Sequence, residues 1–277
     1  MKQKPNIFEY LEYRSFLKDL FAFKKSENAT FSHRSFARLA GLQSSNFLKL
    51  VMDAQRNLSP KAIHQFAKAF KLNKNESDFF EALVYFNQAK SMEEKNRYYD
   101  RISQFKKYHD AKPLDVHQYT YFSNWYFVAL RELTLLKSFK EDTVWINKKL
   151  KARLHPDEIK RAIRILLDLK LLHRDAKGSL RQSDAKISSS PEMGILAVYN
   201  FHREMIQKAG ESIEKSLAEH RDISGLTLAL SKKQFEKIRL RLNEMRREIH
   251  ELSCEESDKE AVYQVNFQLF NLSEVLW

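Results

Sequence analysis

Residues 35–71 read SFARLAGLQSSNFLKLVMDAQRNLSPKAIHQFAKAFK, and this stretch decides the fold that we expect. Its apolar residues recur at spacings of three and four, which is the helical period, and two connections interrupt the pattern. Gly41 marks the first connection, because glycine suits a sharp turn between helices. Ser59 and Pro60 mark the second, because serine caps a helix and proline favours its first position. The stretch therefore predicts three short helices in a helix-turn-helix arrangement, which is typical of DNA-binding proteins.

The second of these helices is expected to start at Ser44–Ser45–Asn46 and to carry small polar side chains and a lysine outward. Such side chains suit base edges and phosphates in a major groove, whereas a solvated helix usually shows glutamate and lysine. A plain three-helix core would have the same apolar spacing, so the DNA hypothesis depends on this polar face. We expect base contacts from Ser44, Ser45, Asn46 and Lys49, and phosphate contacts from Arg34, Arg56, Asn57 and Lys61.

The composition is that of a soluble globular protein with two or three domains. The chain has 277 residues, of which 43% are hydrophobic and 30% charged. No apolar run approaches the roughly 18 residues that a membrane span needs, and the first residues are too charged for a secretory signal. The single cysteine, Cys254, excludes an internal disulfide and fits a reducing compartment. We therefore expect a cytoplasmic protein with no membrane partner.

The net charge of +12 is unevenly distributed along the chain. Residues 1–90 hold 15 Lys and Arg against 8 Asp and Glu, and residues 91–190 hold 21 against 13. Residues 191–277 reverse the balance, with 12 against 15. The basic excess lies in the first two thirds, which is where a polyanion such as double-stranded DNA would bind.

Four groups of residues resemble a family of predicted bacterial transcriptional regulators. The resemblance implies an N-terminal helix-turn-helix joined to a C-terminal domain of unknown function, and it extends over nearly the whole chain. Ala54 departs from the pattern, because the family usually has glycine there; if that position needs a positive φ, alanine costs about 1 kcal/mol. The four groups are Ile7, Phe8, Tyr10, Tyr13 and Arg14; Phe31, Ser32, Arg34, Phe36 and Ala37; Arg56, Asn57, Leu58 and Ser59; and Glu76, Phe79, Phe80, Leu83, Val84 and Phe86 to Lys90.

The expected fold class is mainly α, in three segments. Residues 1–112 form a helical domain containing the helix-turn-helix (35–71), and residues 113–190 form a winged-helix-like domain. In the latter, helices ending near Leu169 precede two short strands, 171–174 and 180–183, around the turn pair Lys177–Gly178. The winged helix either adds a second DNA contact or serves only for packing or dimerisation. The second-contact residues would be Lys160, Arg161, Arg164, Arg174, Lys177 and Arg181.

Residues 191–277 are predicted to form a small α+β unit. Polar and apolar residues alternate over 223–230 and 261–272, which is the period of a strand, and a helix over 235–252 separates them. A two-stranded or larger antiparallel sheet should follow. This unit would bind a small-molecule or protein effector, or form the interface of a homodimer.

Catalytic motifs are weak, and we expect neither an enzyme nor a bound cofactor or metal. Ser212 and Lys215 form an isolated Ser-x-x-Lys without the accompanying motifs of penicillin-recognising enzymes. The leading hypothesis is a sequence-specific DNA-binding transcriptional regulator, expected as a homodimer. The alternative is a non-enzymatic regulatory interaction protein whose C-terminal unit binds a partner or a small signalling ligand.

Overall fold

The computed structural model describes residues 3–183 and 191–275. It divides the chain into two compact units, Met1–Val116 and His117–Trp277, which are described separately below. The described residues are mainly helical, with thirteen α-helices and one two-stranded antiparallel sheet, as predicted. The segment boundary expected at residue 190 lies outside the described residues. In the described part of the chain no helix is long and apolar enough to cross a membrane.

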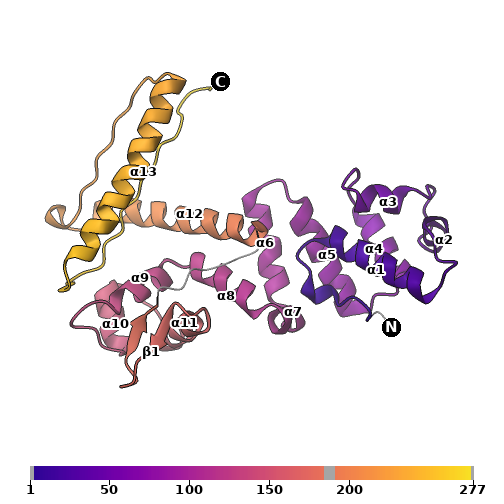
Figure 1. The fold of residues 1–277 in the computed structure, drawn as a ribbon, viewed down its shortest axis with the longest axis horizontal. Coiled ribbons are helices and arrows are strands. Elements are labelled where there is room, and N and C mark those ends of the chain that lie inside the picture. The colour runs from indigo at the N-terminus through magenta and orange to yellow at the C-terminus, as the bar shows by residue number, and fades with distance from the viewer. Residues whose placement is uncertain (1–2, 184–190, 276–277) are drawn as a thin grey trace. The chain divides into compact units, whose positions relative to one another are not determined.

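Unit 1 is a bundle of short helices around α5 (Figure 1). Six apolar side chains of α5 are buried, and its start is capped reciprocally: Asn73 Oδ1 accepts from the Glu76 amide at 3.0 Å and Glu76 Oε2 accepts from the Asn73 amide at 2.9 Å. The elements are η1 (Ile7–Glu9), α1 (Tyr13–Glu27), α2 (His33–Leu39), α3 (Phe47–Met52), α4 (Pro60–Ala69), α5 (Lys74–Gln88), α6 (Met92–Ser103) and α7 (Lys106–Ala111). Helix α8 (Pro113–Phe122) crosses the division between the units.

The three helices expected over residues 35–71 are present as α2, α3 and α4. Most of their apolar side chains are buried as predicted, but Phe47 is half-buried and Leu39 is 58% exposed, whereas Ala37 is buried. Helix α1 is separate from η1, because the Glu12 carboxylate accepts a hydrogen bond from the Ser15 amide at 2.7 Å and so caps a new helix.

Ala54 has a φ of +60° in the turn that ends α3. The following amides, of Gln55 and Arg56, both donate to the Leu50 carbonyl, at 2.8 and 3.1 Å, so this left-handed residue closes the helix end. The positive φ that the departure from the family pattern suggested is therefore present.

The first part of unit 2 is a winged helix. Helices α9 (Trp125–Leu133), α10 (Thr143–Leu150) and α11 (Pro156–Asp168) precede strands β1 (Leu172–Arg174) and β2 (Leu180–Gln182). The strands pair antiparallel with His173 opposite Arg181, and Gly178 takes a φ of +80° in the turn between them. Buried residues from all five elements form one hydrophobic core, so the predicted helices and hairpin are confirmed.

The rest of unit 2 consists of two long helices and extended chain. Helix α12 (Pro191–Lys215) contacts α9, the short turn η2 (Ala218–His220) follows, and α13 (Lys232–Glu255) lies between two extended segments. Alternation over 223–230 and 261–272 predicted strands of a sheet, yet neither segment pairs with another strand in the described chain. The alternation specifies an extended backbone, whereas a sheet also needs a neighbouring strand, which the described chain does not supply.

We expect Ala54→Gly to stabilise the protein by up to about 1 kcal/mol, because glycine adopts a positive φ without the steric strain that alanine meets there. The measurement is the free energy of unfolding from denaturant titration. Ala69→Gly, in the helical last turn of α4, is the matched control and should destabilise. A loss of stability from Ala54→Gly would contradict the assigned backbone conformation.

Candidate nucleic-acid interface

Helix α3 is held with one face in the core and the other in solvent. It packs on α1 and α2, and Leu48, Val51 and Met52 are buried in this contact. Gly41, with a φ of +63°, makes the turn from α2, and Gln65 of α4 donates to its carbonyl oxygen at 3.4 Å. The residues between the apolar ones are therefore directed outward.

The outward side chains at the start of α3 have no partner in the protein. Ser44, Ser45, Asn46 and Lys49 are exposed, and their side chains make no hydrogen bond or ion pair with the described chain. Helix α3 begins at Phe47, three residues later than expected, and Asn46 is its N-cap residue without using its side chain as a cap. The side-chain amide of Asn46 therefore remains available to a ligand.

The four predicted phosphate-binding residues are also exposed. Arg34 lies on α2, Lys61 on α4, and Arg56 and Asn57 on the connection between α3 and α4, and the three cations have no carboxylate partner in the described chain. Asn57 is different, because its Oδ1 accepts a hydrogen bond from Arg14 Nη2 at 2.7 Å. Its amide nitrogen alone remains to donate to a phosphate.

The helix-turn-helix is almost free of acidic residues. Between Glu27 and Glu76 the sequence contains eight Lys and Arg and one carboxylate, Asp53. Residues 28–75 therefore carry a net charge of +7, which accounts for the whole basic excess of residues 1–90. Such a segment attracts polyanions and repels other cations.

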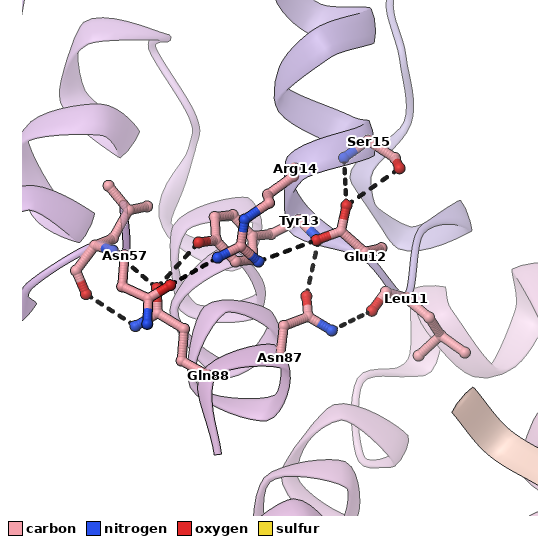
Figure 2. Close-up of polar contacts among 9 residues, drawn as sticks. Leu11, Glu12, Tyr13, Arg14, Ser15, Asn57, Asn87 and Gln88 are labelled. Atoms are coloured by element: carbon pink, nitrogen blue, oxygen red, sulfur yellow. Dashed lines mark hydrogen bonds and ion pairs between the residues drawn. The ribbon is translucent and has the colours of Figure 1, made fainter. Parts of the chain in front are cut away.

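The connection between α3 and α4 is fixed by the last residue of α5 (Figure 2). Gln88 Oε1 accepts from the Leu58 amide at 2.8 Å, and Gln88 Nε2 donates to the Leu58 carbonyl at 2.9 Å. The same Oε1 accepts from the Tyr13 hydroxyl at 3.0 Å. Burial raises the pKa of Tyr13 to about 12, so the hydroxyl stays protonated and remains a donor.

The neighbouring amide, Asn87, holds the start of α1 in the same way. Asn87 Oδ1 accepts from the Tyr13 amide at 2.9 Å, and Asn87 Nδ2 donates to the Leu11 carbonyl at 2.8 Å. We call Asn87 and Gln88 the amide clamp. Four residues that carry the family resemblance have contacts here. Tyr13 and Leu58 bond to the amide clamp, and Arg14 bonds to Asn57 beside it (Figure 2).

His33, the first residue of α2, interacts with residues of α1 and α3. Its ring stacks on Phe21 of α1 with centroids 4.4 Å apart. Its pKa is lowered from 6.5, first because burial disfavours the charged ring and next because the Lys49 ammonium is close. The effect of Lys49 brings α3 and the start of α2 together in one positive region.

The residues predicted for a second contact fall into two groups. Arg174 forms a bidentate ion pair with Glu141, at 2.8 and 2.9 Å, and Arg181 pairs with Asp175 at 3.0 Å. Lys160 lies 3.8 Å from a carboxylate oxygen of Asp157. The remaining three are exposed without an ion pair in the described chain, two on α11 and one at the tip of the wing: Arg161, Arg164 and Lys177.

Two further residues belong to this surface although they are not among the eight predicted contact residues. Arg38 and Gln43 flank the turn into α3, are exposed, and make no side-chain hydrogen bond with the described chain. Their positions on either side of Gly41 were the available signal. Among the described residues, no group of three or more His, Cys, Asp or Glu side chains could hold a metal ion.

Comparison with known proteins gives a family for the C-terminal part of the chain. A family model described as "Domain of unknown function (DUF4423)" matches residues 105–272. No curated protein and no solved structure matches the chain. The match contains the winged helix and α13, and it leaves the helix-turn-helix outside.

We expect the pKa of His33 to lie below 6.5 and to rise in Lys49→Ala, because removing the ammonium removes part of the penalty on the imidazolium. Proton NMR of the histidine rings over a pH titration measures this, and Lys61→Ala is the control that should leave the value unchanged. Because the folded pKa is lowered, the stabilisation from neutral His33 is present above 6.5 and is lost as the pH falls through the folded value. An unchanged pKa in Lys49→Ala would contradict the placement of α3 beside His33.

Proposed function

Because the chain belongs to the DUF4423 family, whose description names no activity, we propose its function from the surface of unit 1: sequence-specific binding of double-stranded DNA as a transcriptional regulator. In this proposal the start of α3 enters the major groove. Ser44, Ser45, Asn46 and Lys49 contact base edges there.

The observation that supports the proposal is the combination of an unengaged polar helix face with a surrounding surface of unpaired cations. A solvated helix face in an ordinary bundle carries carboxylates that neutralise its lysines, whereas residues 28–75 have one carboxylate against eight cations. Arg34, Arg56 and Lys61 come from three different elements around α3, which suits contacts to phosphates on both sides of a groove. The resemblance to bacterial regulators, carried by residues 7–90, agrees with this function.

The winged helix contributes the second contact in this proposal. Arg161 and Arg164 lie on the exposed face of α11, the third helix of the winged helix, and Lys177 lies in the wing. We narrow the six predicted second-contact residues to these three, because Lys160, Arg174 and Arg181 already lie beside the carboxylates of Asp157, Glu141 and Asp175.

The alternative function is that of a regulatory protein that acts only through protein partners. The exposed apolar residues of the C-terminal helices favour it, since surfaces of this kind usually mark interaction sites. One simple measurement distinguishes the two functions: the dependence of DNA affinity on salt concentration, which only the DNA-binding function predicts.

We expect Lys61→Ala to weaken binding to all duplexes about equally and to reduce the slope of log K against log salt concentration by about one, because one phosphate contact is lost. Fluorescence anisotropy with a duplex of mixed sequence measures the slope. The matched control is Lys106→Ala, since Lys106 opens α7, well away from α3 within unit 1 (Figure 1). A wild-type affinity that does not change with salt would reject DNA binding.

We expect Asn46→Ala to relax sequence preference while leaving non-specific affinity nearly unchanged, because its amide is proposed to contact a base edge and each good base contact is worth about 1–3 kcal/mol of discrimination. Selection from a library of random duplexes, followed by sequencing, compares the motifs of wild type and variant. The control is Gln55→Ala, because Gln55 is exposed in the connection that follows α3. Identical motifs for Asn46→Ala and wild type would exclude Asn46 from base recognition.

A further inference from the structure

Helix α13 is long, but none of its side chains lies fully in a hydrophobic core. It spans 24 residues, and none of its side chains is buried in the chain. An isolated helix depends on packing of its apolar face for most of its stability, so a helix of this length needs a cover. The described chain covers this helix only in part: six of its residues are half-buried and the other eighteen are exposed, although extended chain runs beside it (Figure 1).

The apolar residues of α13 follow the heptad repeat of a coiled coil. Six of them recur with spacings of three, four, three, four and three, which fills three successive pairs of core positions. Met245 is 46% exposed and Leu252 61%, and the other four are half-buried. We call these residues the α13 seam: Phe235, Ile238, Leu242, Met245, Ile249 and Leu252.

The α13 seam is complementary to itself when two copies run antiparallel. In such a pair the first core position of one helix faces the second core position of the other. A single register then aligns all the core residues in three pairings: Phe235 with Leu252, Leu242 with Met245, and Ile249 with Ile238. Twofold symmetry repeats each pairing, so the dimer has six layers.

The charges of α13 favour the same antiparallel direction. Residues 232–243 carry five Lys and Arg and one Glu, whereas residues 244–255, the second half of the helix, carry four Glu and two Arg. An antiparallel pair therefore sets a segment of +4 against one of −2 at each end, and a parallel pair would set like against like. Beside the seam, Arg241 faces Glu248 of the second copy in this register. Arg239 would face Arg246, and Arg239 is already paired with Glu236 at 2.7 Å.

We propose that the chain forms a homodimer in which the α13 seam packs antiparallel against the α13 seam of a second copy. The occupant of this surface is a second copy because the layers and the charges of the seam are matched by the same helix reversed. The proposal is independent of DNA binding, since it rests on unit 2 alone.

The test is the mass of the full-length chain in solution without DNA, measured by analytical ultracentrifugation. We expect twice the 32.9 kDa of one chain for the wild type, and a single chain for the double variant Leu242→Glu, Met245→Glu. Leu240→Glu is the matched control, because Leu240 is 58% exposed on the same helix but lies outside the seam; it should remain dimeric. A monomeric wild type, or a dimeric double variant, would overturn the proposal.

Two further measurements test the direction of pairing. Raising the salt concentration should weaken an antiparallel dimer, because the facing ends attract, and should strengthen a parallel one. In a Cys254→Ser background, Phe235→Cys and Leu252→Cys chains should form a disulfide when mixed and oxidised, and neither should link to itself. Efficient self-linking of Leu252→Cys would show a parallel pair and reject the register. Circular dichroism of each variant confirms that its helices are retained.

Discussion

The amide clamp is the interaction on which the arrangement of unit 1 depends. Asn87 and Gln88 end the most buried helix of the unit. Their side chains bond four backbone groups: the amide and carbonyl of Leu58, the amide of Tyr13 and the carbonyl of Leu11. A backbone group left unsatisfied in the interior costs about 1–3 kcal/mol, so each two-point contact selects one position of the segment that it holds. Through these contacts α5 positions α1, on which α3 packs, and also the connection that leaves α3. Helix α5 thus fixes the orientation of α3 from the core side, through α1 and the connection after α3, without contributing to the exposed face of α3.

Local features of this chain were predictable because their causes lie within a few residues. The reciprocal caps at Asn73 and Ser231, the proline start at Pro60 and the turn at Gly178 each depend on neighbours three or four positions away. The positive φ at Ala54 was accessible through the resemblance alone. By contrast, the amide clamp joins residues 30 and 75 positions apart, and no periodicity reveals such a contact.

For the candidate interface, the exposure of the contact residues was predictable from the sequence, whereas their ion pairs were not. The eight residues are exposed, as their polar side chains predicted, but ion pairing was not predictable: Glu141 neutralises Arg174 across 33 positions, so the sequence overstated the charge of the wing. The polar contact between Arg14 and Asn57 was hidden for the same reason. A count of cations along a chain therefore gives an upper limit to the charge that a surface offers, and the helix-turn-helix reaches that limit because it has almost no carboxylates nearby.

The extended segment over residues 261–272 also affects the tendency of the protein to aggregate. It reads AVYQVNFQLFNL, twelve residues without a charge or a proline, and it makes no backbone–backbone hydrogen bond in the described chain. Segments of this composition stack into cross-β aggregates when several chains expose them together. The charges that flank it, Lys259 and Glu260 before and Glu274 after, act as gatekeepers that slow such stacking. The solubility of the protein in a cell is therefore tied to how soon after synthesis this strand acquires a neighbour.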